Sequence, residues 1–129
     1  MILLKYYKTI IILILVLLLS LLPASTVHKV RFINIPHFDK IVHFFMYFFL
    51  TSASLIDIKN NIKNPRRLLI FSVIFSIIVM SGIIEIIQAN YIFGRSGSWY
   101  DLLANISGTI ISIILFYKTF IFVKPHQDF

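Results

Sequence analysis

Four long apolar runs, separated by short polar connectors, dominate this chain of 129 residues. A soluble domain of that size has too little interior to hide the hydrophobic residues that make up 59% of the sequence. A bilayer accepts such side chains on the outside of a helix, and about 20 apolar residues suffice for one crossing. The sequence therefore predicts an all-α, polytopic membrane helical bundle, a single domain over residues 1–129, with four transmembrane helices at about 6–22, 39–58, 68–90 and 100–123.

A formal net charge of +7 is typical of proteins that bind nucleic acid, but here the basic residues flank the apolar runs instead of forming a basic stripe on a soluble face. We therefore expect no nucleic-acid partner and interpret these residues as topology signals. Lys and Arg concentrate at the amino terminus, in residues 59–67 and near the carboxyl end, and these regions share one side in a four-span chain. Both termini are thus predicted to be cytoplasmic, whereas the connectors around 28–38 and 94–99 are predicted to face outward.

The first run has the charge pattern of either a signal peptide or a retained anchor. Cleavage of a signal peptide requires a small-x-small site. The segment Leu22-Pro23-Ala24-Ser25-Thr26 offers only a poor one, so we predict a retained helix. The chain contains no cysteine, which excludes disulfide bonds, thiolate metal sites and a cysteine nucleophile.

The last three runs carry polar side chains near the ends that are predicted to face outward. Ionisable groups inside a membrane span are costly, so each is a functional candidate. Spacings of three or four residues place the polar groups of each run on one helix face. Together with an arginine from the outer connector, they are predicted to converge in one pocket inside the bundle: Asp39, His43, Glu85, Gln88, Arg95, Asp101 and Asn105.

Neighbouring residues support this convergence. Gly82 and Gly108 are predicted to let helix backbones approach closely, and Ser112 is predicted to donate or accept a hydrogen bond across a helix contact. The guanidinium of Arg95 is expected to reach down to Glu85 or Asp101 and to balance a negatively charged site.

Taken in order, these residues resemble the VanZ-like family, which is named for a protein associated with teicoplanin resistance. The resemblance covers about residues 39–115, and the order and spacing of the pieces carry it more than any single piece does. The pieces are Asp39-Lys40-Ile41-Val42-His43-Phe44 with Tyr47, Gly82-Ile83-Ile84-Glu85-Ile86-Ile87-Gln88, Gly94-Arg95-Ser96, and Asp101-Leu102-Leu103-Ala104-Asn105 with Gly108. The resemblance implies a multi-pass protein of the bacterial cytoplasmic membrane, linked in some family members to tolerance of glycopeptide antibiotics.

Purely structural interpretations stand beside these. Asp39 is also a candidate N-cap of its helix, and the segment from Ser98 to Asp101 is typical of a capping box. His43 on an apolar face can be a packing residue, and Asn105 can simply join two helices. For Glu85, a carboxylate inside a span, a role beyond packing is favoured, with Arg95 as a plain counter-ion the alternative.

Three functions remain open. The favoured one is a protein that binds or modulates a lipid or lipid-linked envelope precursor through the outward-facing pocket. The second is an intramembrane enzyme acting on a lipid headgroup, with His43 and Glu85 as general acid and base and Arg95 stabilising anionic charge. The third is a structural assembly subunit. No nucleotide, haem or flavin motif is present, so we expect no cofactor. We also predict no metal site, because a set of His43, Glu85 and Asp101 would contain only one imidazole.

Overall fold

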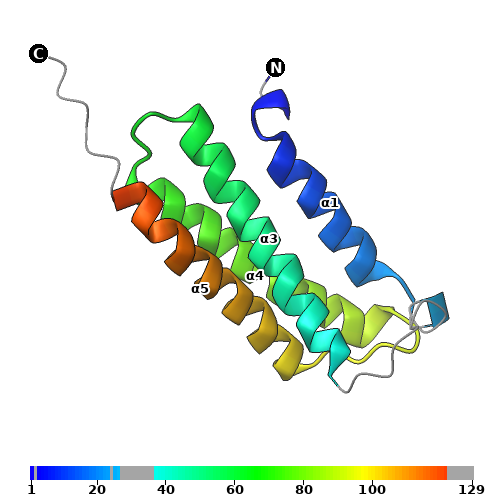
Figure 1. The fold of residues 1–129 in the computed structure, drawn as a ribbon. Helices are drawn as coiled ribbons and strands as arrows, with labels where there is room; N and C mark the ends of the chain where they lie inside the picture. Colours follow the sequence, from blue (N-terminus) through cyan, green and yellow to red (C-terminus); the bar gives the residue numbers. More distant parts are fainter. Residues whose placement is uncertain (2, 24, 27–36, 122–129) are drawn as a thin grey trace, which may run out of the picture.

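The computed structural model describes residues 1, 3–23, 25–26 and 37–121. Within them the chain is all-helical. The short 3-10 helix Leu3–Lys5 precedes the helices α1 (Tyr7–Leu21), α3 (Phe38–Asn61), α4 (Arg67–Tyr91) and α5 (Trp99–Ile121) (Figure 1). These helices confirm the four predicted runs. The predictions for residues 28–36 and for those from 122 onward lie outside the described part of the chain.

The helices differ in length. Among the described residues, α3, α4 and α5 are long and apolar enough to cross a membrane. Helix α1 is also apolar but has 15 residues. At 1.5 Å per residue it rises about 22 Å, less than the roughly 30 Å of a bilayer's hydrocarbon layer. The chain is therefore a helical membrane protein with three full-length spans and a shorter apolar helix.

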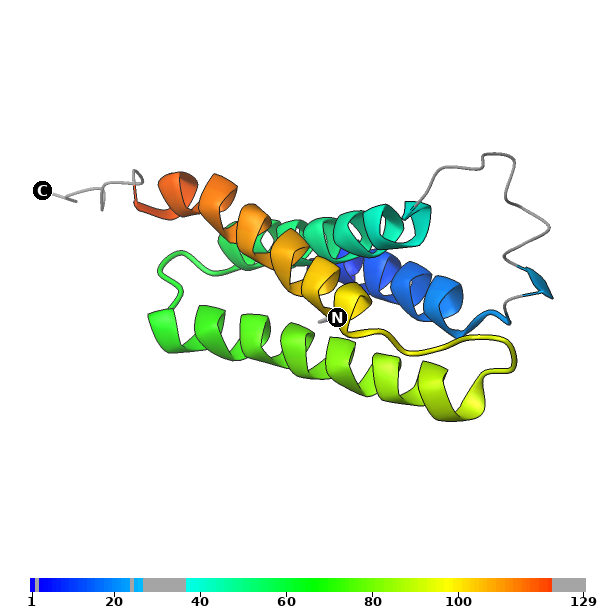
Figure 2. The same cartoon turned by 90° about the horizontal axis from the view of Figure 1, so that it is seen from below.

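Helix α3 lies between two others. Its most extensive contact is with α5, and α1 packs against it next (Figure 1). Helix α4 forms a second layer, visible in Figure 2, and contacts α5, α3 and α1. The end of the bundle that holds Asp39, Glu85 and Asp101 is called the Glu85 end below, and the opposite end, which holds Asp57, is called the Asp57 end. Helices α3, α4 and α5 therefore bring their polar residues to the same end of the bundle, as predicted.

Two glycines that look alike in the sequence behave differently. A Cβ on Gly108 would collide with the carbonyl oxygen of Phe44 and would lie 3.0 Å from the backbone nitrogen of Phe48, so the absence of a side chain lets α5 touch the backbone of α3. A Cβ on Gly82 would meet nothing within 4 Å. The prediction of close approach is therefore right for Gly108 and wrong for Gly82, because no other part of the described chain approaches Gly82 as closely.

Hydroxyl pairs extend the contact between α3 and α5 toward the Asp57 end. Thr51 Oγ1 donates to Thr109 Oγ1 at 3.3 Å, and the hydroxyl oxygens of Ser52 and Ser112 lie 2.9 Å apart. All four side chains are buried. The second pair confirms that Ser112 bonds across a helix contact.

Asp57 of α3 holds the first turn of α1. Its side chain is buried, and Oδ2 accepts hydrogen bonds from the backbone nitrogen of Thr9 at 2.9 Å and from Thr9 Oγ1 at 2.8 Å. Lys8 Nζ lies 3.9 Å from Oδ1. Helix α1 lacks a side-chain cap at its own N-cap residue, Tyr6. A carboxylate satisfies free N–H groups at a helix start and interacts favourably with the helix dipole, so α3 caps α1.

Candidate functional site

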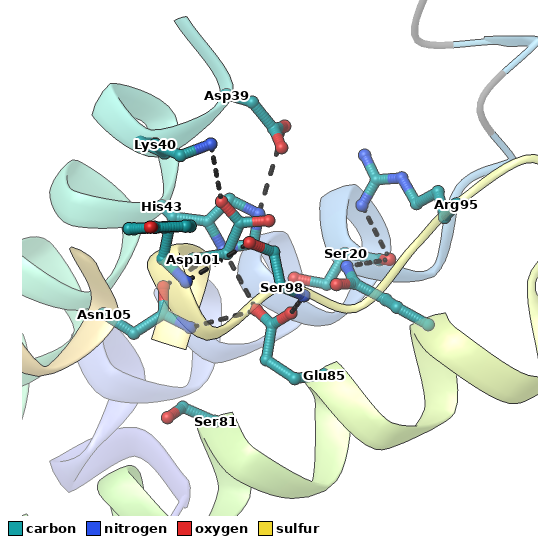
Figure 3. Close-up of polar contacts among 12 residues, drawn as sticks. Ser20, Asp39, Lys40, His43, Ser81, Glu85, Arg95, Ser98, Asp101 and Asn105 are labelled. Carbon is teal, nitrogen blue, oxygen red and sulfur yellow. Dashed lines mark hydrogen bonds and ion pairs between the residues drawn. The ribbon is translucent and has the colours of Figure 1, made fainter. Parts of the chain in front are cut away.

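Polar side chains from three helices gather at the Glu85 end of the bundle (Figure 3). His43 comes from α3, Glu85 from α4, and Asp101 and Asn105 from α5. All four are at least nine-tenths buried. Each lies within the first or last two turns of its helix, so the meeting of helix ends brings them together. The sequence-based prediction that these residues share one layer is therefore correct.

The innermost contacts join one residue from each of these helices. His43 Nδ1 lies 3.1 Å from Asn105 Oδ1 and 3.6 Å from Glu85 Oε1. Asn105 Nδ2 donates to the same Glu85 oxygen at 3.4 Å. The three side chains thus form a closed polar triangle in which Asn105 serves both the imidazole and the carboxylate. Joining helices and serving a site are compatible roles for Asn105.

The second oxygen of Glu85 binds the start of α5. Ser98 is the residue before α5, and its backbone nitrogen donates to Glu85 Oε2 at 3.3 Å, while Ser98 Oγ accepts from the nitrogen of Tyr100 at 3.2 Å. In the expected capping box, the carboxylate of Asp101 would accept a hydrogen bond from the backbone nitrogen of Ser98. Glu85, from α4, accepts this hydrogen bond instead. Gly97 makes this possible: a Cβ there would collide with the Glu85 carbonyl oxygen.

His43 presents its other ring nitrogen to the outer part of the cluster. Nε2 lies 4.0 Å from Asp39 Oδ1, one turn earlier on α3. Asp39 is the second residue of α3, and the N-cap position belongs to His37, so the N-cap interpretation of Asp39 is wrong. Ligand atoms of Asp39, His43 and Asp101 all lie within 4.8 Å of one another. The residues that could share a metal ion therefore include Asp39, whereas Glu85 faces the opposite nitrogen of the ring.

Lys40 supplies a charge that the sequence-based prediction of the site omitted. Its Nζ lies 3.5 Å from Asp101 Oδ1 and 5.9 Å from the centre of the Tyr100 ring. The Lys40 side chain is 33% exposed, so the ammonium group lies at the rim of the cluster. Asp101 is buried, and within the described residues its Oδ1 has this ion pair but no hydrogen-bond partner. From the sequence alone, Lys40 is one of the basic residues that indicate topology. Its ion pair with Asp101 depends on how α3 is rotated about its axis relative to α5, which the sequence does not indicate.

Arg95 and Gln88 bind α1 and not the acidic groups. Arg95 donates from a terminal guanidinium nitrogen to the carbonyl oxygen of Ser20 at 3.1 Å, and Gln88 Nε2 donates to the same oxygen at 2.8 Å. The guanidinium makes no ion pair with Glu85 or Asp101, so the expected pairing is wrong. The carbonyl groups of a last helical turn lack partners within the helix. Ser20 offers such a carbonyl, and no sequence pattern identifies it.

Tyr47 lies one turn deeper on α3 than His43. Its side chain is 1% exposed, and its hydroxyl has no hydrogen-bond partner among the described residues. Buried hydroxyl groups are usually paired, because an unpaired one costs free energy. The cluster therefore contains unused hydrogen-bonding capacity at two positions, Tyr47 Oη on its deep side and Asp101 Oδ1 near its rim.

A family model described as VanZ/LLP1 matches residues 4–123. No curated protein and no solved structure gave a match.

Proposed function

The chain belongs to the VanZ/LLP1 family, as the resemblance in its motifs indicates, and from this membership and the polar cluster we propose that it binds the headgroup of a membrane lipid or a lipid-linked envelope precursor. The observation that carries the proposal is a buried polar cluster, with unused hydrogen-bonding capacity, that ends in partly exposed charged groups. A membrane protein tolerates such groups where they serve a ligand, an ion or a proton.

The cluster offers complementary chemistry for such a headgroup. The ammonium of Lys40 at the rim can pair with a phosphate, and Asp101 Oδ1 can accept a hydrogen bond from a sugar hydroxyl or a peptide N–H. Arg95 is half-buried and uses one contact on Ser20, which leaves other N–H donors of its guanidinium for a ligand. Trp99 and Tyr100, the first two residues of α5, are exposed, as in the aromatic belt of a membrane interface.

Lipid retention tests the proposal directly. The protein is purified from its native membrane in mild detergent, and co-purifying lipids are identified by mass spectrometry. Asn105→Ala is expected to lower the amount of the retained lipid about tenfold, the loss of roughly 1.4 kcal/mol that one buried hydrogen bond explains. The matched control is Asn90→Ala, since Asn90 is exposed on α4 and bonds only to Ile86 of its own helix. Equal retention by both variants would refute the proposal.

We place the Glu85 end at the outer face of the bacterial cytoplasmic membrane, in accord with the basic residues near the Asp57 end. The chain has no cysteine, so a single introduced one is a clean reporter. An impermeant maleimide applied to intact cells is expected to label Trp99→Cys, and to label Lys63→Cys only after permeabilisation. The reversed pattern would place the cluster at the cytoplasmic face.

The proposal extends to glycopeptide tolerance, because a protein that holds an envelope precursor can alter the access of such antibiotics to it. Glu85→Gln and Lys40→Gln are compared with the unaltered protein for teicoplanin sensitivity at matched membrane abundance. Lys40 is a better choice than Arg95, which also holds α1 through Ser20. Unchanged sensitivity in both variants would contradict this part of the proposal.

An intramembrane enzyme is the second candidate, and the position of His43 favours it. Its imidazole lies between Asp39 on one nitrogen and Glu85 on the other, an arrangement that can orient a general base. Lys40 pairs with Asp101 at the rim of the cluster, whereas Arg95 binds the Ser20 carbonyl, so Lys40 would take the role of stabilising anionic charge. Incubation with lipid extracts, followed by mass spectrometry of released headgroups, distinguishes a catalyst from a binding protein. Product that accumulates beyond one equivalent per protein would favour the enzyme.

A further inference from the structure

The two nitrogens of His43 face different surroundings, and this defines the state of the ring. Nδ1 faces Asn105 Oδ1 at 3.1 Å and Glu85 Oε1 at 3.6 Å. The amide orientation of Asn105 is fixed by its other end, because Nδ2 donates to Glu85. Both groups near Nδ1 are therefore acceptors, so Nδ1 carries a hydrogen. In the neutral imidazole, Nε2 then keeps a free lone pair.

The lone pair on Nε2 points toward further negative charge. Asp39 Oδ1 lies 4.0 Å from Nε2, and the ligand atoms of Asp39, His43 and Asp101 all lie within 4.8 Å of one another. Three electron-rich atoms that face one another repel, and a cation or a proton between them relieves this repulsion. Ligands bound about 2.1 Å from one ion are roughly 3.4 Å apart in a tetrahedral site, so modest side-chain movements would close this set around a metal.

A second observation comes from Asp101. The residue is 4% exposed, and within the described residues its Oδ1 has no hydrogen-bond partner. We propose that Asp39, His43 and Asp101 bind a divalent transition-metal ion, with Zn²⁺ and Mn²⁺ as suitable probes. One imidazole with two carboxylates suits these ions better than Mg²⁺ or Ca²⁺, which prefer oxygen ligands alone. The site goes beyond headgroup binding and does not depend on it.

Asn105 and Glu85 act on the metal through His43. Histidine ligands of metals usually donate their second N–H to a carboxylate or carbonyl group, which fixes the tautomer and the orientation of the ring. The contacts at Nδ1 have this arrangement. Asn105 and Glu85 are therefore positioning residues, and loss of such a partner typically costs tenfold to hundredfold in metal affinity.

Lys40 competes with the metal. Its ammonium lies 3.5 Å from Asp101 Oδ1, and its side chain is 33% exposed. A metal ion bound at Asp101 repels this ammonium, which can move outward to water or to a lipid phosphate. Removing the charge is therefore expected to strengthen metal binding, about threefold for a partly exposed ion pair.

The full chain in detergent is treated with a chelator, and Zn²⁺ alone is titrated by calorimetry. We expect one equivalent of metal. Asp39→Asn, His43→Gln and Asp101→Asn should each lower the affinity at least tenfold, and Asp39 is 39% exposed, so its variant should stay folded if the buried ones do not. His37→Gln is the matched control, because His37 is exposed at the same end of the bundle but lies outside the set.

The positioning role has its own measurement. Mn²⁺ bound to the Asn105→Ala variant should show a changed paramagnetic resonance spectrum and about tenfold lower affinity. Lys40→Gln should raise the affinity. Zn²⁺ binding that is the same in folded Asp39→Asn as in the unaltered protein, or lost equally in His37→Gln, would overturn the proposal, as would the absence of stoichiometric binding.

Discussion

The two ends of the bundle each bury acidic groups, yet they use them in different ways. At the Asp57 end, the carboxylate of Asp57 accepts bonds of 2.8 and 2.9 Å from Thr9 and has Lys8 as an ion-pair partner. At the Glu85 end, the contacts of Glu85 range from 3.3 to 3.6 Å. Asp101 at the same end has an oxygen without a hydrogen bond in the described residues.

Burial therefore does not distinguish a structural acid from a candidate ligand-binding acid in this molecule. Asp57 and Asp101 are 1% and 4% exposed. They differ in the hydrogen bonds that the chain supplies: Asp57 Oδ2 accepts two from Thr9, whereas Asp101 Oδ1 has the ion pair with Lys40 and no hydrogen bond within the described residues. A carboxylate that accepts short hydrogen bonds from another helix holds the two helices together, whereas an oxygen with unused capacity can accept a ligand or a cation. Substitutions at Gly108, Asp57, Glu85 and Ser112 test this difference.

Gly108→Ala should affect both ends, because they share the contact between α3 and α5. The new Cβ would collide with the Phe44 carbonyl oxygen, so a helix must shift. We expect a loss of about 3 kcal/mol in the free energy of unfolding, at the upper end for overpacking, measured by denaturation in detergent. Gly82→Ala is the control and should be neutral or slightly stabilising, since its Cβ meets nothing within 4 Å. Equal losses in the two variants would contradict the assigned contact.

Asp57→Ala should destabilise the protein by about 2 kcal/mol and leave ligand binding at the Glu85 end intact. It removes the cap of α1 and leaves the backbone N–H and the hydroxyl of half-buried Thr9 without this acceptor. Asp39→Ala, at a partly exposed position, should cost less than about 1 kcal/mol. Stability is again measured by denaturation and compared with lipid retention. A stable Asp57→Ala protein that fails to retain lipid would reverse the proposed roles of the two ends.

Glu85→Gln should show the opposite pattern, with a loss of only about 1 kcal/mol and a marked loss of binding. Gln keeps one acceptor oxygen, which can serve either Ser98 or Asn105 but not both, and it removes the charge. Denaturation and lipid retention are measured on the same preparation. If this variant were less stable than Asp57→Ala while it still bound lipid normally, Glu85 would be the structural acid.

Ser112→Ala should have the smallest effect, about 0.6 kcal/mol, the average for hydrogen bonds between membrane helices. It removes one bond with Ser52 in the middle of the bundle, between the two ends. Ser107→Ala is the control, because Ser107 is exposed on α5 and bonds only to Leu103 of the same helix. A loss well above 1 kcal/mol would show that this hydroxyl pair, and not the ends, dominates the contact.

Much of the arrangement could be predicted from the sequence because helix periodicity determines which residues share a face. The runs of apolar residues indicate the helices, and spacings of three and four place His43, Glu85, Asp101 and Asn105 in one cluster. The matched family model confirms the resemblance that these residues suggested.

The specific pairings could not be predicted, because they depend on helix rotation and on backbone groups. Arg95 finds the Ser20 carbonyl and not a carboxylate, and Asp57 finds the Thr9 backbone nitrogen. A peptide carbonyl or N–H group has no signature in the sequence. Gly82 and Gly108 also show that residue type alone does not determine which glycine touches a neighbouring backbone.

The shortness of α1 has a consequence for the surrounding lipid. A helix that rises about 22 Å, held at its start by Asp57 and at its end by Gln88 and Arg95, is hindered from sliding to match a thicker bilayer. Local thinning of the bilayer accommodates a helix shorter than the hydrocarbon layer, and we expect it beside α1. In bilayers of increasing acyl-chain length, a spin label on Leu21 should keep its distance from the lipid phosphates; a distance that grows with the thickness of the bilayer would contradict local thinning. Such local thinning would bring lipid phosphates closer to Lys40 at the rim of the polar cluster. A headgroup could then reach the cluster without leaving its own leaflet.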